Sequence, residues 1–163
     1  MIFKKHTHDL YNILLTLSRN IFFYEKIKLS DNFETRLYLI FMHFSILIII
    51  FRKKKNKFSQ DIYDSIFHNI ENDLRELGIG DVTVNKKMKE FNKIFYDILL
   101  KIEKDKQIKF EINYKLISRY FDLFDSENCS KFTEFKNYFN KFYGFCFGLP
   151  LNNMLSNLKN FKY

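Results

Sequence analysis

The sequence is short of the residues that interrupt helices. Its 163 residues include one proline and four glycines, and they contain no alanine and no tryptophan. A sheet protein of this length needs many tight turns, so the scarcity of turn residues argues against a β fold. Because 47% of the residues are hydrophobic, the chain is able to bury one continuous core. We therefore predict an all-α fold, a single compact bundle of about six helices over residues 1–163.

Cysteine and histidine are too few and too scattered to predict a metal site or a disulfide framework. Cys129 and Cys146 have no metal-ligand spacing and are expected to be free thiols in a reducing compartment. His43 falls in an apolar segment and His68 on a polar helix face. Histidines in such positions are usually hydrogen-bonded structural residues, not bases or haem ligands. We expect no metal and no cofactor.

No arrangement of nucleophiles or carboxylates predicts catalysis. The acidic residues of segment 64–76 lie along one helix, where a solvated charged face is the usual role. Gly78 and Gly80 lack the third glycine of a dinucleotide-binding motif and follow a helix instead of a strand. No serine or cysteine stands in a nucleophile elbow. We predict that the protein is not an enzyme, which leaves catalysis as the least favoured hypothesis.

The chain lacks a recognisable targeting segment and contains one long apolar run. Its first residues carry neither the apolar core of a signal peptide nor an Arg- and Ser-rich amphipathic leader, so we expect it to stay where it is made. The run from Leu39 to Phe51 is shorter than the ~20 apolar residues of a membrane span, and Arg36 and Arg52 bound it. A central core helix is the prediction, and a membrane-dipping segment is the alternative.

Hydrophobic periodicity locates the helices. A first helix is expected from Thr7 to about residues 24–28, and the others over about 32–54, 59–77, 85–105, 110–124 and 130–143. Ser30 and Asp31 are predicted to cap the second helix, with Glu34 completing a capping box. Residues 144–150 should break the pattern, which leaves a weakly ordered tail over about 151–163.

The third predicted helix has clear start and stop signals. Ser59 is the predicted N-cap, and Gly78 follows the last periodic apolar residue, where a left-handed backbone conformation is common. Residues 78–84 are therefore expected to form a tight corner before the next helix.

Basic residues outnumber acidic ones, 27 to 19, which gives a net charge of +8. Of the basic residues 22 are lysine, part of which reflects an AT-rich genome. Basic residues interleaved with aromatic ones bind RNA through phosphate contacts and stacking, but most aromatic residues here fall at core spacing. A basic ribosome- or RNA-binding helical module is therefore the alternative function.

One segment carries a pattern more specific than composition. It consists of Ser59-Gln60, Asp64, Phe67, the run from Asp73 to Asp81 (Asp-Leu-Arg-Glu-Leu-Gly-Ile-Gly-Asp), Val84, Lys86 to Met88 and Phe95-Tyr96. This pattern resembles the ubiquinol-cytochrome c chaperone family. Upstream positions agree as well: Arg19, Phe23-Tyr24, Asp31, Arg36 and Leu39 to His43. Asn32, Thr35 and Asp97 depart from the family's usual Thr, Gly and Gly. The clear likeness covers about residues 10–100, and a family-like core is expected over about 10–125.

The resemblance implies an assembly chaperone that binds newly made cytochrome b, or its nascent chain, and promotes biogenesis of the ubiquinol-cytochrome c reductase complex of the respiratory chain. The ribosome and a peripheral contact with the inner membrane are further candidate partners, and no specific DNA binding is expected. The expected location is the bacterial cytoplasm, at the cytoplasmic face of the inner membrane, or the mitochondrial matrix in a eukaryote.

The resemblance also selects the candidate site residues. Those expected to contact the client or another partner are Arg19, Tyr24, Arg36, His43, Arg75, Glu76, Asp81, Lys86 and Lys87. Those expected to have a structural role are Asp31, Asp73, Gly78 and Gly80. For the arginines two interpretations stay open: a buried ionic network that locks the bundle, or a surface that faces the client.

Overall fold

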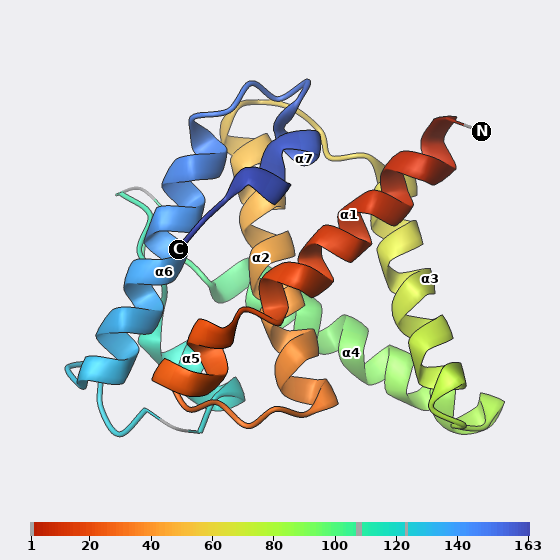
Figure 1. Ribbon diagram of the computed structural model, residues 1–163, viewed down its shortest axis with the longest axis horizontal. Helices are drawn as coiled ribbons and strands as arrows, with labels where there is room; N and C mark the ends of the chain where they lie inside the picture. Colours follow the sequence, from red (N-terminus) through yellow and green to blue (C-terminus); the bar gives the residue numbers. More distant parts are fainter. Residues whose placement is uncertain (1, 107–108, 123) are drawn as a thin grey trace.

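The computed structural model describes residues 2–106, 109–122 and 124–163, with the backbone alone for residues 2–9. Seven α-helices pack together, and the described residues contain no strand, which confirms the all-α prediction (Figure 1). The helices are α1 (Ile2–Ser18), α2 (Phe33–Lys53), α3 (Gln60–Glu76), α4 (Asp81–Lys101), α5 (Tyr114–Tyr120), α6 (Ser130–Phe147) and α7 (Met154–Asn157). A π-helical turn, η1 (Phe22–Lys26), follows α1, and a 3-10 turn, η2 (Leu158–Asn160), follows α7.

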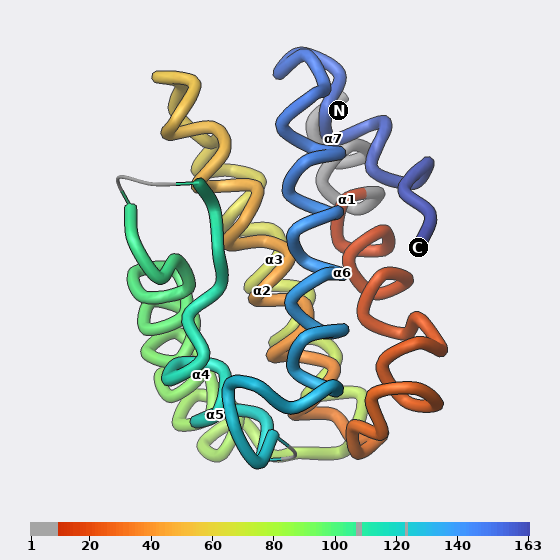
Figure 2. Tube along the Cα trace, turned by 90° about the vertical axis from the view of Figure 1, so that its left-hand side faces the viewer, coloured from red at the N-terminus to blue at the C-terminus, as the bar shows by residue number. Residues whose placement is uncertain are grey.

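Helix α2 lies at the centre of the bundle, as the apolar run predicted. It packs against α1, α4 and α6, and Figure 2 shows these helices around it. From Leu37 to Ile50 all but two residues are buried. By length and composition α2 could cross a membrane, but 67% of its most apolar 18-residue window is buried inside the protein. Neighbouring helices thus supply the apolar surroundings that this segment requires.

The start of α2 differs from the prediction by one residue. Its N-cap is Asn32, whose side-chain oxygen accepts a hydrogen bond from the Thr35 amide at 2.9 Å. The predicted capping box on Ser30, Asp31 and Glu34 is wrong, because the Asp31 carboxylate pairs instead with Arg36. Asn and Asp are equally good N-cap residues, so the sequence alone did not determine whether Asp31 or Asn32 caps α2.

The first predicted helix is two elements. Helix α1 begins at Ile2, earlier than Thr7, whose side chain lies outside the described residues, and it ends at Ser18. The chain then bends, and the Asn20 side chain accepts a hydrogen bond from the Phe22 amide at 3.0 Å to start η1. The bend buries Phe22 and Phe23 in the core.

The corner between α3 and α4 is tighter than predicted. Ser59 caps α3 as expected, and its hydroxyl accepts from the Ile62 amide at 3.4 Å. Gly78 has φ +84°, the left-handed conformation predicted for it. Helix α4 begins at Asp81, four residues earlier than expected, so the corner spans only residues 77–80.

The C-terminal third departs most from the expected boundaries. Helix α5 is shorter than the predicted 110–124 because its flanks are extended, with an isolated bridge between Glu103 and Ile112. Helix α6 continues to Phe147, through Gly144, where a break was expected. In the tail, Met154, Leu158 and Phe161 are buried in the core, so this segment packs on the bundle.

A buried histidine organises the aromatic core. The His43 Nδ1–H donates to the Leu39 carbonyl oxygen at 2.6 Å, which leaves Nε2 to accept from the Tyr138 hydroxyl at 2.8 Å. The rings of Phe23, Phe139 and Phe142 pack around the imidazole. Burial lowers the pKa of His43 to about 4, so the ring is neutral at physiological pH.

We expect Gly78→Val to lower the free energy of unfolding by about 1 kcal/mol or more, because valine resists a positive φ. A Cβ at Gly78 would meet no atom within 4 Å, so the cost is one of backbone conformation. Denaturant unfolding measures it. The control is Gly80→Ser, at an ordinary φ of −69°, where serine is a good N-cap and no loss is expected. An unchanged midpoint for Gly78→Val would refute the corner assignment.

We expect an alkaline carbonate wash to release the protein from membranes. A core helix is removed with the whole folded protein, whereas a membrane span stays in the bilayer. The measurement is an immunoblot of pellet and supernatant. Retention of the chain in the pellet would show that α2 spans the membrane.

We expect stability to fall as the pH drops from 7 to 5. In the unfolded chain His43 binds a proton near pH 6.5, but in the folded protein only near pH 4, so acid favours unfolding between these values. The loss from this residue should be about 2 kcal/mol between pH 7 and 5. Urea unfolding of wild type and His43→Asn at both pH values measures it, with the exposed His68→Asn as control. Equal pH slopes for all three proteins would contradict the assignment.

Candidate functional site

Most of the candidate site residues lie at one end of the bundle. At this end α1 finishes, η1 and α2 begin, and the corner joins α3 to α4, as both views show. We call it the junction end and define it by Arg19, Tyr24, Asp31, Arg36, Asp73, Arg75, Glu76 and Asp81. The sequence separation between its first and last members means that the fold, not the local chain, assembles it.

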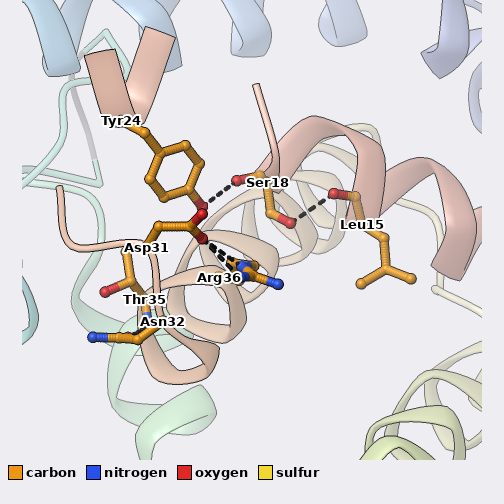
Figure 3. Close-up of polar contacts among 7 residues, drawn as sticks. All are labelled: Leu15, Ser18, Tyr24, Asp31, Asn32, Thr35 and Arg36. Atoms are coloured by element: carbon orange, nitrogen blue, oxygen red, sulfur yellow. Dashed lines mark hydrogen bonds and ion pairs between the residues drawn. The ribbon is translucent and has the colours of Figure 1, made fainter. Parts of the chain in front are cut away.

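Tyr24 connects η1 to the end of α1 (Figure 3). Its hydroxyl donates to the Ser18 carbonyl oxygen at 2.7 Å, while the Ser18 hydroxyl donates to the Leu15 carbonyl oxygen at 2.7 Å. Burial of the ring and the nearby Asp31 carboxylate raise the pKa of Tyr24 to about 12. Tyr24 is therefore a neutral hydrogen-bond donor that closes the last turn of α1, and its ring is half-buried.

Asp31 and Arg36 form an ion pair across the N-terminus of α2. The Nε and Nη2 atoms of Arg36 each lie 2.8 Å from Oδ1 of Asp31 (Figure 3). The side chains are 62% and 37% exposed, respectively. An exposed pair of this kind is worth at most about 1 kcal/mol, so it is a poor lock for the bundle.

A second polar contact joins α1 to α3. The Tyr11 hydroxyl donates to the Asp73 carboxylate. Burial, followed by this hydrogen bond and the charge of Asp73, raises the pKa of Tyr11, while the positive charge of Arg19 opposes the rise. Arg19 acts on Tyr24 in the same direction, so its guanidinium lies within electrostatic reach of both tyrosines. Arg19 is exposed and has no ion-pair partner among the described side chains.

Arg75 stabilises the corner between α3 and α4. Its Nη2 lies 3.1 Å from Glu71 Oε1 and its Nε lies 3.3 Å from Asp81 Oδ1. Glu76 beside it is exposed. Farther along α4, Lys86 is exposed and Lys87 half-buried, and neither forms an ion pair within the described part of the chain. These two lysines present uncompensated charge next to the corner.

Two candidate residues are placed differently from the others. His43 is fully buried in the aromatic core, so no partner reaches it in this structure. Gly80 has an ordinary φ of −69°, and a Cβ there would meet no atom within 4 Å. The predicted structural need for glycine thus applies to Gly78 and not to Gly80.

The interpretation of the arginines as parts of a buried ionic network is wrong. The side chains of Arg36 and Arg75 are 37% and 41% exposed, and those of Asp31 and Asp81 are 62% and 84% exposed. Sequence reasoning also missed Tyr11, which ties α1 to Asp73. Its signal was present, because Tyr11 shares a helix face with Leu14 at a spacing of three.

The side chains of the junction end are mostly exposed and charged. It offers exposed cations and anions side by side. Among the described residues no three His, Cys, Asp or Glu side chains gather where they could hold a metal ion.

A comparison with models of protein families identifies the family that this sequence matches. The family model for the ubiquinol-cytochrome C chaperone matches residues 25–107, just over half of the chain. The matched range contains Asp31, Arg36 and the whole α3–α4 corner, while Arg19 and Tyr24 lie just before it. Comparison with curated proteins and with solved structures found no significant match. The family match covers the α3–α4 corner and more than half of the chain. The chain therefore belongs to the ubiquinol-cytochrome C chaperone family.

Proposed function

We propose that the protein binds newly made cytochrome b and holds it competent for assembly into the ubiquinol-cytochrome c reductase complex. Family membership implies a role in assembly of this complex. The observation that carries the proposal is that the family match covers Asp31, Arg36 and the α3–α4 corner, where the exposed ion pairs Asp31–Arg36 and Arg75–Asp81 lie. Members of a chaperone family typically do not catalyse a reaction.

The surface chemistry supports a transient contact. A chaperone must release its client, so its contacts should be individually weak and exchangeable. The exposed ion pairs Asp31–Arg36 and Arg75–Asp81 each contribute at most about 1 kcal/mol, so a client's charged groups are able to replace them at little cost. The unpaired cations Arg19, Lys86 and Lys87 favour acidic or nascent-chain partners.

The proposed working location is the cytoplasmic face of the bacterial inner membrane, or the matrix side in a mitochondrion. Contact with the ribosome and with the membrane surface belongs to this proposal. The basic end of α2, with exposed Arg52, Lys55 and Lys57, supports it.

Deleting the gene should leave the cytochrome b message unchanged and lower the amounts of cytochrome b protein and of the assembled complex. A chaperone changes the yield of folding, so the complex that still assembles should have normal activity per haem. Reverse transcription, immunoblots, haem spectra and native gels measure these quantities. Wild-type levels of cytochrome b in the deletion strain would refute the proposal.

Two charge-matched triple variants then separate the client surface from the RNA alternative. Arg75→Gln/Lys86→Gln/Lys87→Gln should reduce the amount of cytochrome b recovered with the tagged protein. The difference in recovery between wild type and this variant should become smaller at higher salt, because salt screens the charged contacts that only the wild type makes. Arg52→Gln/Lys55→Gln/Lys57→Gln is the control with equal charge loss. Recovery of ribosomal RNA without cytochrome b, lost in the control variant alone, would favour the basic RNA-binding module instead.

A further inference from the structure

A groove lies away from the α3–α4 corner, between α1 and the C-terminal segment. Its volume is about 1160 Å³. One wall is the α1 face that carries Leu10, Ile13 and Leu17, and the other is formed by residues 151–163, with Leu151 and Leu155. Figures 1 and 2 both show the C-terminal segment running beside α1. At one end of the C-terminal wall, the ring of Tyr163 packs against that of Phe22 in η1, with centroids 4.7 Å apart.

The apolar part of the groove is only partly covered. Leu10 is buried, but Ile13, Leu151 and Leu155 are half-buried and pack against the core from one side. Leu10, Ile13 and Leu17 follow a spacing of three and four along α1, over about 11 Å of helix. Leu10 and Leu17 are buried, so Ile13 is the member of this stripe that an apolar helix face could reach, together with Leu151 and Leu155 on the opposite wall.

The charged residues that line the groove within the described side chains are cations. They are Arg19 on the α1 wall and Lys159 and Lys162 on the opposite wall, and no described groove residue is acidic. All three are exposed, and none forms an ion pair with another described residue. The groove therefore complements an occupant with negative charge on both flanks.

The polar lining favours a peptide over a lipid. The amide side chains of Asn12 and Asn152 line the groove and make no hydrogen bond within the described residues. An acyl chain laid over them would remove their water without replacing those hydrogen bonds, whereas polar side chains of a peptide replace them.

We propose that this groove binds an amphipathic helix of a partner protein, about two turns of which lie in the groove, with an apolar face and acidic residues on both flanks. The apolar face fits between Ile13 and Leu155, and the acidic side chains pair with Arg19, Lys159 and Lys162. The inference does not depend on cytochrome b being the client, because it rests on the groove alone.

The test uses the full chain and two synthetic helical peptides that carry leucine at positions i, i+3, i+7 and i+10. One has glutamate on both flanks and the other has lysine at the same positions. Fluorescence anisotropy of the labelled peptides measures binding. The glutamate peptide should bind at least about tenfold more tightly than the lysine peptide.

Three variants locate the binding. Arg19→Gln/Lys159→Gln/Lys162→Gln should weaken the glutamate peptide by about tenfold, and Ile13→Ser should weaken it at unchanged net charge. Lys89→Gln/Lys93→Gln/Lys115→Gln removes the same charge from exposed positions outside the groove and should leave the affinity unchanged. Melting curves show that each variant is folded.

Four results would overturn the proposal. The first three are that the glutamate peptide does not bind, that both peptides bind equally well, and that the two triple variants weaken binding equally. The fourth is that the groove variants lose binding to vesicles but not to the peptide. For the last, phosphatidylglycerol vesicles are assayed with the same variants. Groove-dependent binding of the vesicles without the peptide would identify a membrane-contact surface.

Discussion

The whole bundle depends on the burial of α2. A helix that is apolar on all sides is stable in water only when other elements cover its entire circumference. Helices α1, α4 and α6 do this, and their amphipathic faces are apolar where they meet α2. The junction end follows from this arrangement, because the elements that must surround the start of α2 bring Arg19, Tyr24 and the α3–α4 corner to the same end of the molecule.

The polar side chains of the buried helix α2 also need hydrogen-bond or ion-pair partners, and the surrounding segments provide them. His43 has two ring nitrogens that need partners, and the Leu39 carbonyl and Tyr138 hydroxyl provide them. At the other end of α2, the Lys53 ammonium lies 2.6 Å from the buried Glu103 carboxylate, and Lys54 donates to the carbonyl oxygens of Phe147 and Leu149. Two of the lysines in this basic cluster therefore hold α2 to its neighbours, which leaves Arg52, Lys55 and Lys57 for contact with partners.

Sequence reasoning succeeded where a local signal determined the structure. The apolar run of α2, the Ser59 cap and the left-handed Gly78 each depend on a few adjacent residues. Boundaries were wrong where tertiary packing outweighs propensity, as in α6, which continues through Gly144 because its aromatic face packs on the core. The pairing of His43 with Tyr138 and of Tyr11 with Asp73 was beyond the sequence, because each joins residues more than sixty positions apart.

The difference between local signals and tertiary packing also applies to the candidate site. The sequence predicted which residues belong to it, but not how their side chains pair or how exposed they are. The family pattern named Arg19, Arg36 and Arg75, but only the fold shows that Arg36 and Arg75 pair with exposed acids, while Arg19 has no ion-pair partner among the described side chains. Arg19 also lines the groove beside α1 and thus borders both the junction end and that groove. The charge of Arg19 lowers the pKa of both Tyr11 and Tyr24, against the larger effect of burial. The hydroxyls of these tyrosines donate to Asp73 and to the Ser18 carbonyl oxygen, so Arg19 stands between the groove and the hydrogen bonds that connect α1 to its neighbours.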